Sequence, residues 1–150
     1  MQATKNTRSA VGALATIVSL VLIGGTAVAE EAPFQAAGHA TLVGVDRPYE
    51  FISVTGGATQ LGPFEAMRTI RNFGHTTVAT TTLVGRNGDS INIDSEVEWD
   101  KHFTEATGFF VITGGTGRFE GATGYGAESI GTFDPAIGAR VLTWDGVIDF

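Results

Sequence analysis

Two carboxylates with a spacing suited to acid–base chemistry lie near the middle of the chain. Glu96 and Glu98 are two residues apart, so on an extended strand they share one face. Neighbouring carboxylates raise one another's pKa, and such a pair can exchange protons with a substrate. Glu96 and Glu98 are therefore the candidate catalytic residues. The alternative is that they belong to the solvated outer face of a strand.

The residues around these glutamates favour the outer-face alternative. From Ile91 to Trp99 the odd positions are mainly apolar, whereas the even positions are asparagine or acidic residues. Such alternation is typical of a strand with one buried and one solvated face. The sequence therefore predicts that both glutamates point outward, which ranks an enzyme below a binding protein.

Arginine and aromatic side chains are the candidate ligand-binding residues. Arg68 and Arg71 are three positions apart on one expected strand, so they lie on opposite faces. If one of them points inward, it needs a partner and would anchor a carboxylate; the alternative for each is an exposed position. Tyr125 and Trp144 are aromatic residues on other expected strands. These four residues are the predicted lining or anchoring groups of a ligand site.

The sequence lacks the motifs of nucleotide-binding, metal-binding and thiolate sites. The glycine-rich run 114–124 has neither the third glycine of a dinucleotide fingerprint nor the Gly-Lys-Ser/Thr of a P-loop, and a strand rather than a helix is expected after it. His39, His75 and His102 are far apart in the sequence and show no metal-ligand spacing. The chain has no cysteine, so a thiolate site is excluded. The sequence predicts no metal and no cofactor.

Turn signals and alternation predict an all-β fold that positions these residues. Asn87-Gly88 lies between two strand patterns, and this pair favours a two-residue hairpin turn in which both residues have positive φ. No window shows a sustained helical repeat. The spacing predicts a single antiparallel closed barrel of about eight strands, with a loose lead-in over 30–37. The expected strands are Gly38–Val45, Tyr49–Val54, Phe64–Phe73, Thr76–Val84, Ser90–Trp99, Gly108–Thr113, Arg118–Ser129 and Arg140–Phe150.

The first 29 residues have the pattern of a secretory signal peptide. Lys5 and Arg8 form a basic start, an apolar segment follows over 11–23, and Ala27-Val28-Ala29 is a small-residue cleavage site. The alternative, a membrane anchor, is disfavoured because the apolar segment is short. The sequence thus predicts a cleaved peptide over 1–29, one barrel domain over 30–150, and a secreted or periplasmic protein.

Charge narrows the classes of partner. Without Lys5 and Arg8, seven basic residues remain against sixteen acidic residues, which gives a formal net charge of −9. Such a surface repels phosphate backbones and anionic lipids. We therefore expect no nucleic acid partner and no membrane association after cleavage of the signal peptide. Nothing in the sequence indicates an oligomeric state.

One stretch resembles a known family. The residues Phe110–Phe119 (FVITGGTGRF) and the following Gly121–Gly124 (GATG) are similar to a barrel hairpin of the dirigent and allene oxide cyclase-like proteins. The resemblance implies an eight-stranded antiparallel barrel with a central, largely apolar cavity. Members of this superfamily steer radical coupling or cyclise reactive substrates. The match is short outside the hairpin, so it transfers no catalytic residue to this chain.

Three functions remain open at this point. The leading prediction is an exported barrel that binds a small apolar or amphipathic molecule in its lumen. The second is a cyclase or isomerase, since a shaped cavity can accelerate an intramolecular reaction by orientation. The third is a ligand-free extracellular structural or interaction module whose acidic surface selects basic partners.

Overall fold

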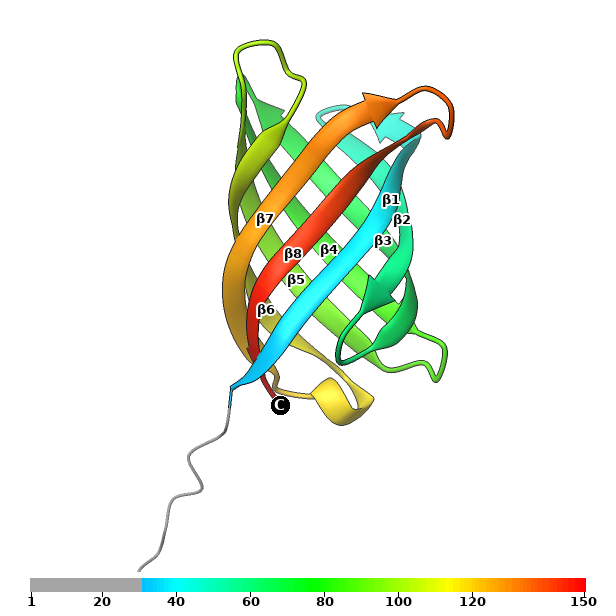
Figure 1. Ribbon diagram of the computed structural model, residues 1–150, viewed down its shortest axis with the longest axis vertical. Coiled ribbons are helices and arrows are strands. Elements are labelled where there is room, and N and C mark those ends of the chain that lie inside the picture. Colours follow the sequence, from blue (N-terminus) through cyan, green and yellow to red (C-terminus); the bar gives the residue numbers. More distant parts are fainter. Residues whose placement is uncertain (1–30) are drawn as a thin grey trace, which may run out of the picture.

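The protein forms a closed antiparallel β-barrel. The structure is a computed structural model that describes residues 31–150; the predicted signal peptide lies outside the described residues. Each strand pairs with its neighbours in sequence, and β8 closes the barrel against β1 (Figure 1). The prediction of an all-β barrel of eight strands is therefore confirmed. Within residues 31–150, no helix is long and apolar enough to cross a membrane.

Eight strands surround a central lumen. Their bounds are β1 (Ala32–Asp46), β2 (Tyr49–Ala58), β3 (Gly62–Phe73), β4 (Thr76–Gly85), β5 (Ser90–Trp99), β6 (Ala106–Thr116), β7 (Thr123–Asp134) and β8 (Ala139–Asp149), with a short 3-10 helix η1 (Gly117–Phe119) between β6 and β7.

The predicted loose lead-in is wrong. The chain enters β1 at Ala32 and pairs with β8 from the Ala32–Ile148 pair onward. Phe34 and Ala36 point inward and are buried. The first residues of the strand are therefore held by both the sheet and the core, because their register with β8 closes the barrel.

The predicted start of the seventh strand at Arg118 is also wrong. Residues Gly117–Phe119 form η1, and β7 begins only at Thr123. Gly117 and Gly121 have φ values of 62° and 77°, a region that glycine enters without steric cost. These two glycines take the chain out of the extended conformation, and the turn places Phe119 fully buried at this end of the barrel.

The β4–β5 hairpin forms at the expected place with a different turn. Gly88 has a φ of 87°, but Asn87 is not in the positive-φ region. The N–H of Gly88 donates to the carbonyl of Gly85 over 3.0 Å, and the N–H of Gly85 donates to the carbonyl of Asp89 over 2.9 Å. The connection is therefore a turn closed by a single left-handed glycine, not the two-residue turn that was predicted.

The predicted register of β5 is confirmed. Ile91, Ile93 and Val97 are buried in the lumen, whereas Glu96 and Glu98 are exposed on the outer face. A similar alternation of buried and exposed residues is found along β3 and β4.

The two ends of the barrel differ. The end near η1 is filled by apolar side chains, and Phe119, Phe34 and Phe110 are fully buried in the core. The opposite end carries the β1–β2, β3–β4, β5–β6 and β7–β8 connections. We call this second end the mouth, because a cavity opens there.

Candidate functional site

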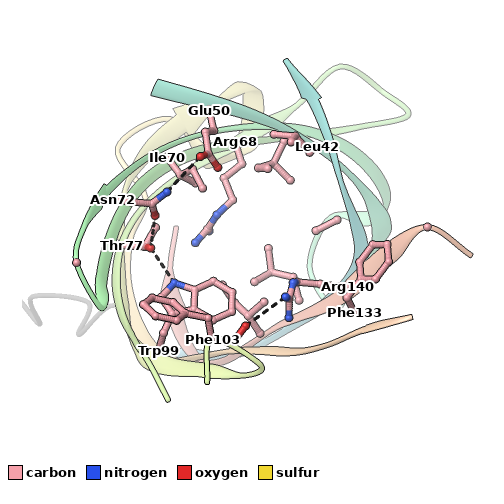
Figure 2. Close-up of a pocket in the computed structure, with 16 residues that line it drawn as sticks. Leu42, Glu50, Arg68, Ile70, Asn72, Thr77, Trp99, Phe103, Phe133 and Arg140 are labelled. Atoms are coloured by element: carbon pink, nitrogen blue, oxygen red, sulfur yellow. Dashed lines mark hydrogen bonds between the residues drawn. The ribbon is translucent and has the colours of Figure 1, made fainter. Parts of the chain in front are cut away.

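A cavity of about 430 Å³ occupies the mouth end of the lumen. Its walls are mostly apolar, with a few polar and charged groups between them, and Figure 2 shows these side chains around the opening. The lining residues are Ala40, Leu42, Glu50, Ile52, Arg68, Ile70, Asn72, Gly74, Thr77, Trp99, Phe103, Ile130, Phe133, Gly138, Arg140 and Leu142. An apolar pocket with a few convergent polar groups is the usual form of a small-molecule site.

A buried ion pair lies at the floor of the cavity. Arg68 extends from β3 across the lumen, and its Nη2 lies 2.5 Å from Oε1 of Glu128 on β7. The indole N–H of Trp144 on β8 donates to Oε2 of Glu128 over 2.8 Å, and Nη1 of Arg68 donates to Oγ1 of Thr81 over 3.2 Å. Arg68 and Glu128 are only 2% and 1% exposed, so each depends on the other for its charge balance.

Arg68 keeps part of its donor capacity free for the cavity. A guanidinium group has five N–H donors, and the hydrogen bonds to Thr81 and Glu128 occupy two of them. Figure 2 shows the guanidinium group pointing toward the centre of the opening. An oxygen acceptor that enters the cavity would therefore meet oriented donors at its floor.

A chain of polar side chains runs along one wall of the mouth. The indole N–H of Trp99 donates to Oγ1 of Thr77 over 2.8 Å, and this hydroxyl donates to Oδ1 of Asn72 over 2.6 Å. The amide nitrogen of Asn72 lies 3.4 Å from Oε1 of Glu50. The chain fixes the indole ring of Trp99 and ends at a carboxylate on the rim (Figure 2).

Arg140 lies at the mouth beside Trp99, on β8. Its Nη1 donates to the carbonyls of Thr104 and Gly131 over 2.6 and 3.0 Å, and its Nη2 donates to the carbonyl of Phe103 over 3.4 Å. The guanidinium carbon lies 5.0 Å from the ring centre of Trp99, a cation–π arrangement. Arg140 thus connects the β5–β6 loop to β7 and β8.

The β5–β6 loop, residues 100–105, lies at the mouth. Its Phe103 has a φ of 56° and stacks on His75, with ring centres 4.2 Å apart. The carboxylate of Asp100 accepts hydrogen bonds from the hydroxyl and the N–H of Thr104. The Thr104 hydroxyl and then its N–H lower the pKa of Asp100 from its ordinary value, because both bonds favour the charged form.

The structure separates the residues that the sequence analysis selected. Arg68 lines the cavity, and Trp144 lies inside the barrel behind Glu128 without lining the cavity. Arg71 and Tyr125 are exposed on the outer face. Glu96 and Glu98, the candidate catalytic residues, are also on the outer face.

Sequence reasoning missed three charged residues of the interior and the mouth: Glu128, Glu50 and Arg140. One signal was available for Glu128. It lies two residues before Ile130 on the same strand, so both side chains point to the same, inward face. The same signal marks Arg140, which is in phase with the inward-facing Leu142 and Trp144 on β8, but its partners on β7 and the β5–β6 loop are set by the tertiary structure. Within residues 31–150, no cluster of three or more histidine and carboxylate side chains is arranged to hold a metal ion.

The fold has counterparts among solved structures. No protein-family model and no curated protein matches the chain. The pterocarpan synthase dirigent protein GePTS1 superimposes with a TM-score of 0.53 at 14% identity, over 81% of this chain and 86% of that one. The pterocarpan synthase dirigent protein PsPTS1 gives a TM-score of 0.54 at 12% identity, over 80% of this chain and 95% of that one. The chain therefore shares the barrel fold of these two dirigent proteins.

Proposed function

We propose that this barrel binds a small, mainly apolar molecule in its lumen. The observation that carries the proposal is the cavity of about 430 Å³, which has apolar walls and the guanidinium group of Arg68 at its floor. Pockets of roughly 300–1,000 Å³ accommodate small organic ligands. A lumen of this size and composition weighs against a ligand-free structural module.

The polar groups of the cavity define what the ligand carries. Arg68 offers donors but no acceptor, so the buried end of the ligand carries an oxygen acceptor such as a carbonyl, ether or phenolic oxygen. The ion pair with Glu128 holds the arginine in place, so little side-chain freedom is lost when it binds. Ile52, Ile70 and Leu142 supply the apolar contact surface.

A cavity-filling substitution tests the proposal. Ala40 faces the lumen and lines the cavity, whereas Thr41 points outward from the same strand. Ala40→Trp fills the cavity and is expected to weaken binding of the neutral fluorescent probe N-phenyl-1-naphthylamine at least roughly tenfold, since the indole occupies the binding volume. Thr41→Trp is the matched control and leaves the affinity unchanged.

Melting temperatures of both variants show whether each is folded. If the probe does not bind the parent protein, or binds a folded Ala40→Trp variant equally well, the lumen is not the binding site. The outer-face residues Arg71 and Tyr125 would then become the next sites to test.

A cyclase or isomerase is the second candidate. Its support is that two solved barrels of the same fold are named pterocarpan synthases, and that orientation in a cavity accelerates intramolecular reactions. Glu50 is the carboxylate that faces the mouth, whereas Glu96 and Glu98 are outside the lumen.

Native mass spectrometry separates the two candidates and bears on the predicted export. The protein is purified from the periplasm or medium of its producing cells, and any bound molecule is released, identified and added back. A molecule recovered unchanged supports a binding protein, whereas its conversion to an isomer supports an enzyme. Protein found only inside the cells would contradict the predicted secreted or periplasmic location.

A further inference from the structure

The two arginines of the cavity differ in their charge balance. Arg68 is neutralised by Glu128 at 2.5 Å. Arg140 has no such partner: within residues 31–150, no carboxylate oxygen lies within 4.0 Å of its guanidinium nitrogens. Its hydrogen bonds go to three backbone carbonyls, which are neutral. The mouth of the cavity therefore carries a half-buried positive charge without a counter-ion.

This charge is held in a fixed orientation. The three carbonyls come from Phe103, Thr104 and Gly131, and they hold both Nη atoms of Arg140. They occupy three of the five N–H donors of the guanidinium group, so two donors remain for another acceptor. A fixed cation with free donors needs little reorganisation to bind an anion, and a planar guanidinium group matches the geometry of a carboxylate.

Aromatic side chains surround this cation. Trp99 lies under the guanidinium group, Phe133 is its direct partner across β7 and β8, and Phe103 lies on the loop that it contacts. Phe103 and Phe133 are 47% and 53% exposed, yet both line the cavity. These rings offer a flat aromatic molecule favourable stacked and edge contacts.

We propose that the ligand is an aromatic carboxylic acid whose carboxylate binds Arg140 at the mouth. The proposal rests on the proposed binding function and adds the chemical class of the ligand. The aromatic body lies among Trp99, Phe103 and Phe133, and its far end points down toward Arg68.

Glu50 sets the orientation of the acid. It lies on the opposite side of the opening from Arg140 (Figure 2), where it accepts a hydrogen bond from Asn72. Its negative charge repels a carboxylate on that side. Arg140 is therefore a specificity-determining residue that selects the charge of the ligand and the end that stays at the mouth.

Two naphthalene derivatives of equal ring size test the charge preference. Calorimetric titration at low salt compares 2-naphthoate with the neutral 2-naphthalenemethanol. We expect the parent protein to bind the acid about tenfold more tightly, because a charge-assisted hydrogen bond is about twice as strong as a neutral one. Arg140→Gln removes this preference and brings the affinities for the acid and the alcohol to within about twofold of each other. Arg140→Lys keeps the positive charge but loses the planar guanidinium group that can form two hydrogen bonds to a carboxylate. This variant is expected to retain part of the preference for the acid.

Arg71→Gln is the matched control, because Arg71 lies on the outer face, and it leaves the preference intact. Circular dichroism confirms the folding of every variant. Equal affinity of the parent protein for acid and alcohol overturns the proposal. Equal loss of both affinities in folded Arg140→Gln also overturns it, since Arg140 would then only brace the loop.

The saturated acid decahydro-2-naphthoate tests whether the ligand must be aromatic. If it binds as tightly as 2-naphthoate, the proposed preference for an aromatic ring is wrong. Suppose that neither 2-naphthoate nor 2-naphthalenemethanol binds, but N-phenyl-1-naphthylamine binds the parent protein and not Ala40→Trp. The proposed ligand class is then wrong, and the proposed binding site in the lumen is retained. If none of the probes binds, the proposed function itself fails.

Discussion

At the scale of the residue, the main feature is a charged pair that is fully enclosed by the barrel. The described chain has a second ion pair, Arg118 with Asp89, but its atoms are 3.9 Å apart and the arginine side chain is 52% exposed. An exposed pair of this kind contributes little stability. Arg68 and Glu128 are different, because removing either one leaves the other as an uncompensated charge in the interior.

Arg68→Met is expected to lower the free energy of unfolding by about 3–5 kcal/mol, because Glu128 is left buried and unpaired. Adding Glu128→Gln removes that charge and keeps an acceptor for the indole of Trp144, so the double variant recovers a large part of the loss. Urea denaturation of Arg68→Met, Glu128→Gln and the double variant measures the coupling. A double variant as unstable as the sum of its single changes would contradict the assignment.

At the scale of the element, the β5–β6 loop owes its shape to its own polar side chains. The hydroxyl and N–H of Thr104 both donate to Asp100, and the peptide N–H of Asp100 donates to the carbonyl of Glu105. Arg140 then connects the loop to the rest of the barrel. The position of Phe103 at the mouth therefore depends on a local network and on contacts with the distant residues Arg140 and His75.

Asp100→Ala is expected to increase hydrogen exchange of residues 100–105 while the strands stay protected, because the loop loses its internal acceptor. The pKa of Asp100 is lowered in the folded protein. The stabilisation by Asp100 is therefore present above the ordinary carboxyl value of 3.8 and is lost as the pH falls through the folded pKa. Asp94→Ala, on the outer face of β5, is the control. Unchanged exchange in the loop would show that Asp100 does not order it.

At the scale of the whole molecule, neighbouring strands of the barrel approach closely, as β7 and β8 do at a pair of glycines. Gly126 pairs with Gly146 across these strands. A Cβ on Gly126 would lie 2.3 Å from the carbonyl oxygen of Asp145 and 2.6 Å from the Cα of Gly146. Only glycine fits this contact without a shift of the backbone.

Gly126→Ala is expected to lower the free energy of unfolding by about 3 kcal/mol, since the added methyl group overpacks the strand pair. Gly131→Ala is a matched control on the same strand, because its Cβ would meet only the carbonyl oxygen of Val141 at an ordinary 3.6 Å. The two melting temperatures give the comparison. Equal values for both variants would contradict the close-packing argument.

The sequence by itself determined the features that depend on neighbouring residues. Alternation within a strand decides which side chains face the core, so the outward direction of Glu96 and Glu98 followed from the residues between Ile91 and Trp99. The composition also excluded thiolate chemistry. Turn geometry was less predictable: the glycines near Arg118 marked a change of direction, but not the 3-10 helix that forms there.

Only the tertiary structure decided which residues form the site. Arg68 and Glu128 are 60 residues apart in the sequence, and strand alternation alone cannot indicate that they meet across the lumen. The first residues of β1, from Ala32 onward, are held in the sheet because β8 returns to pair with them. Arg140 binds a loop 36 residues before it. Such contacts arise from barrel closure, which fixes the position of every strand relative to all the others and so decides which inward side chains come together.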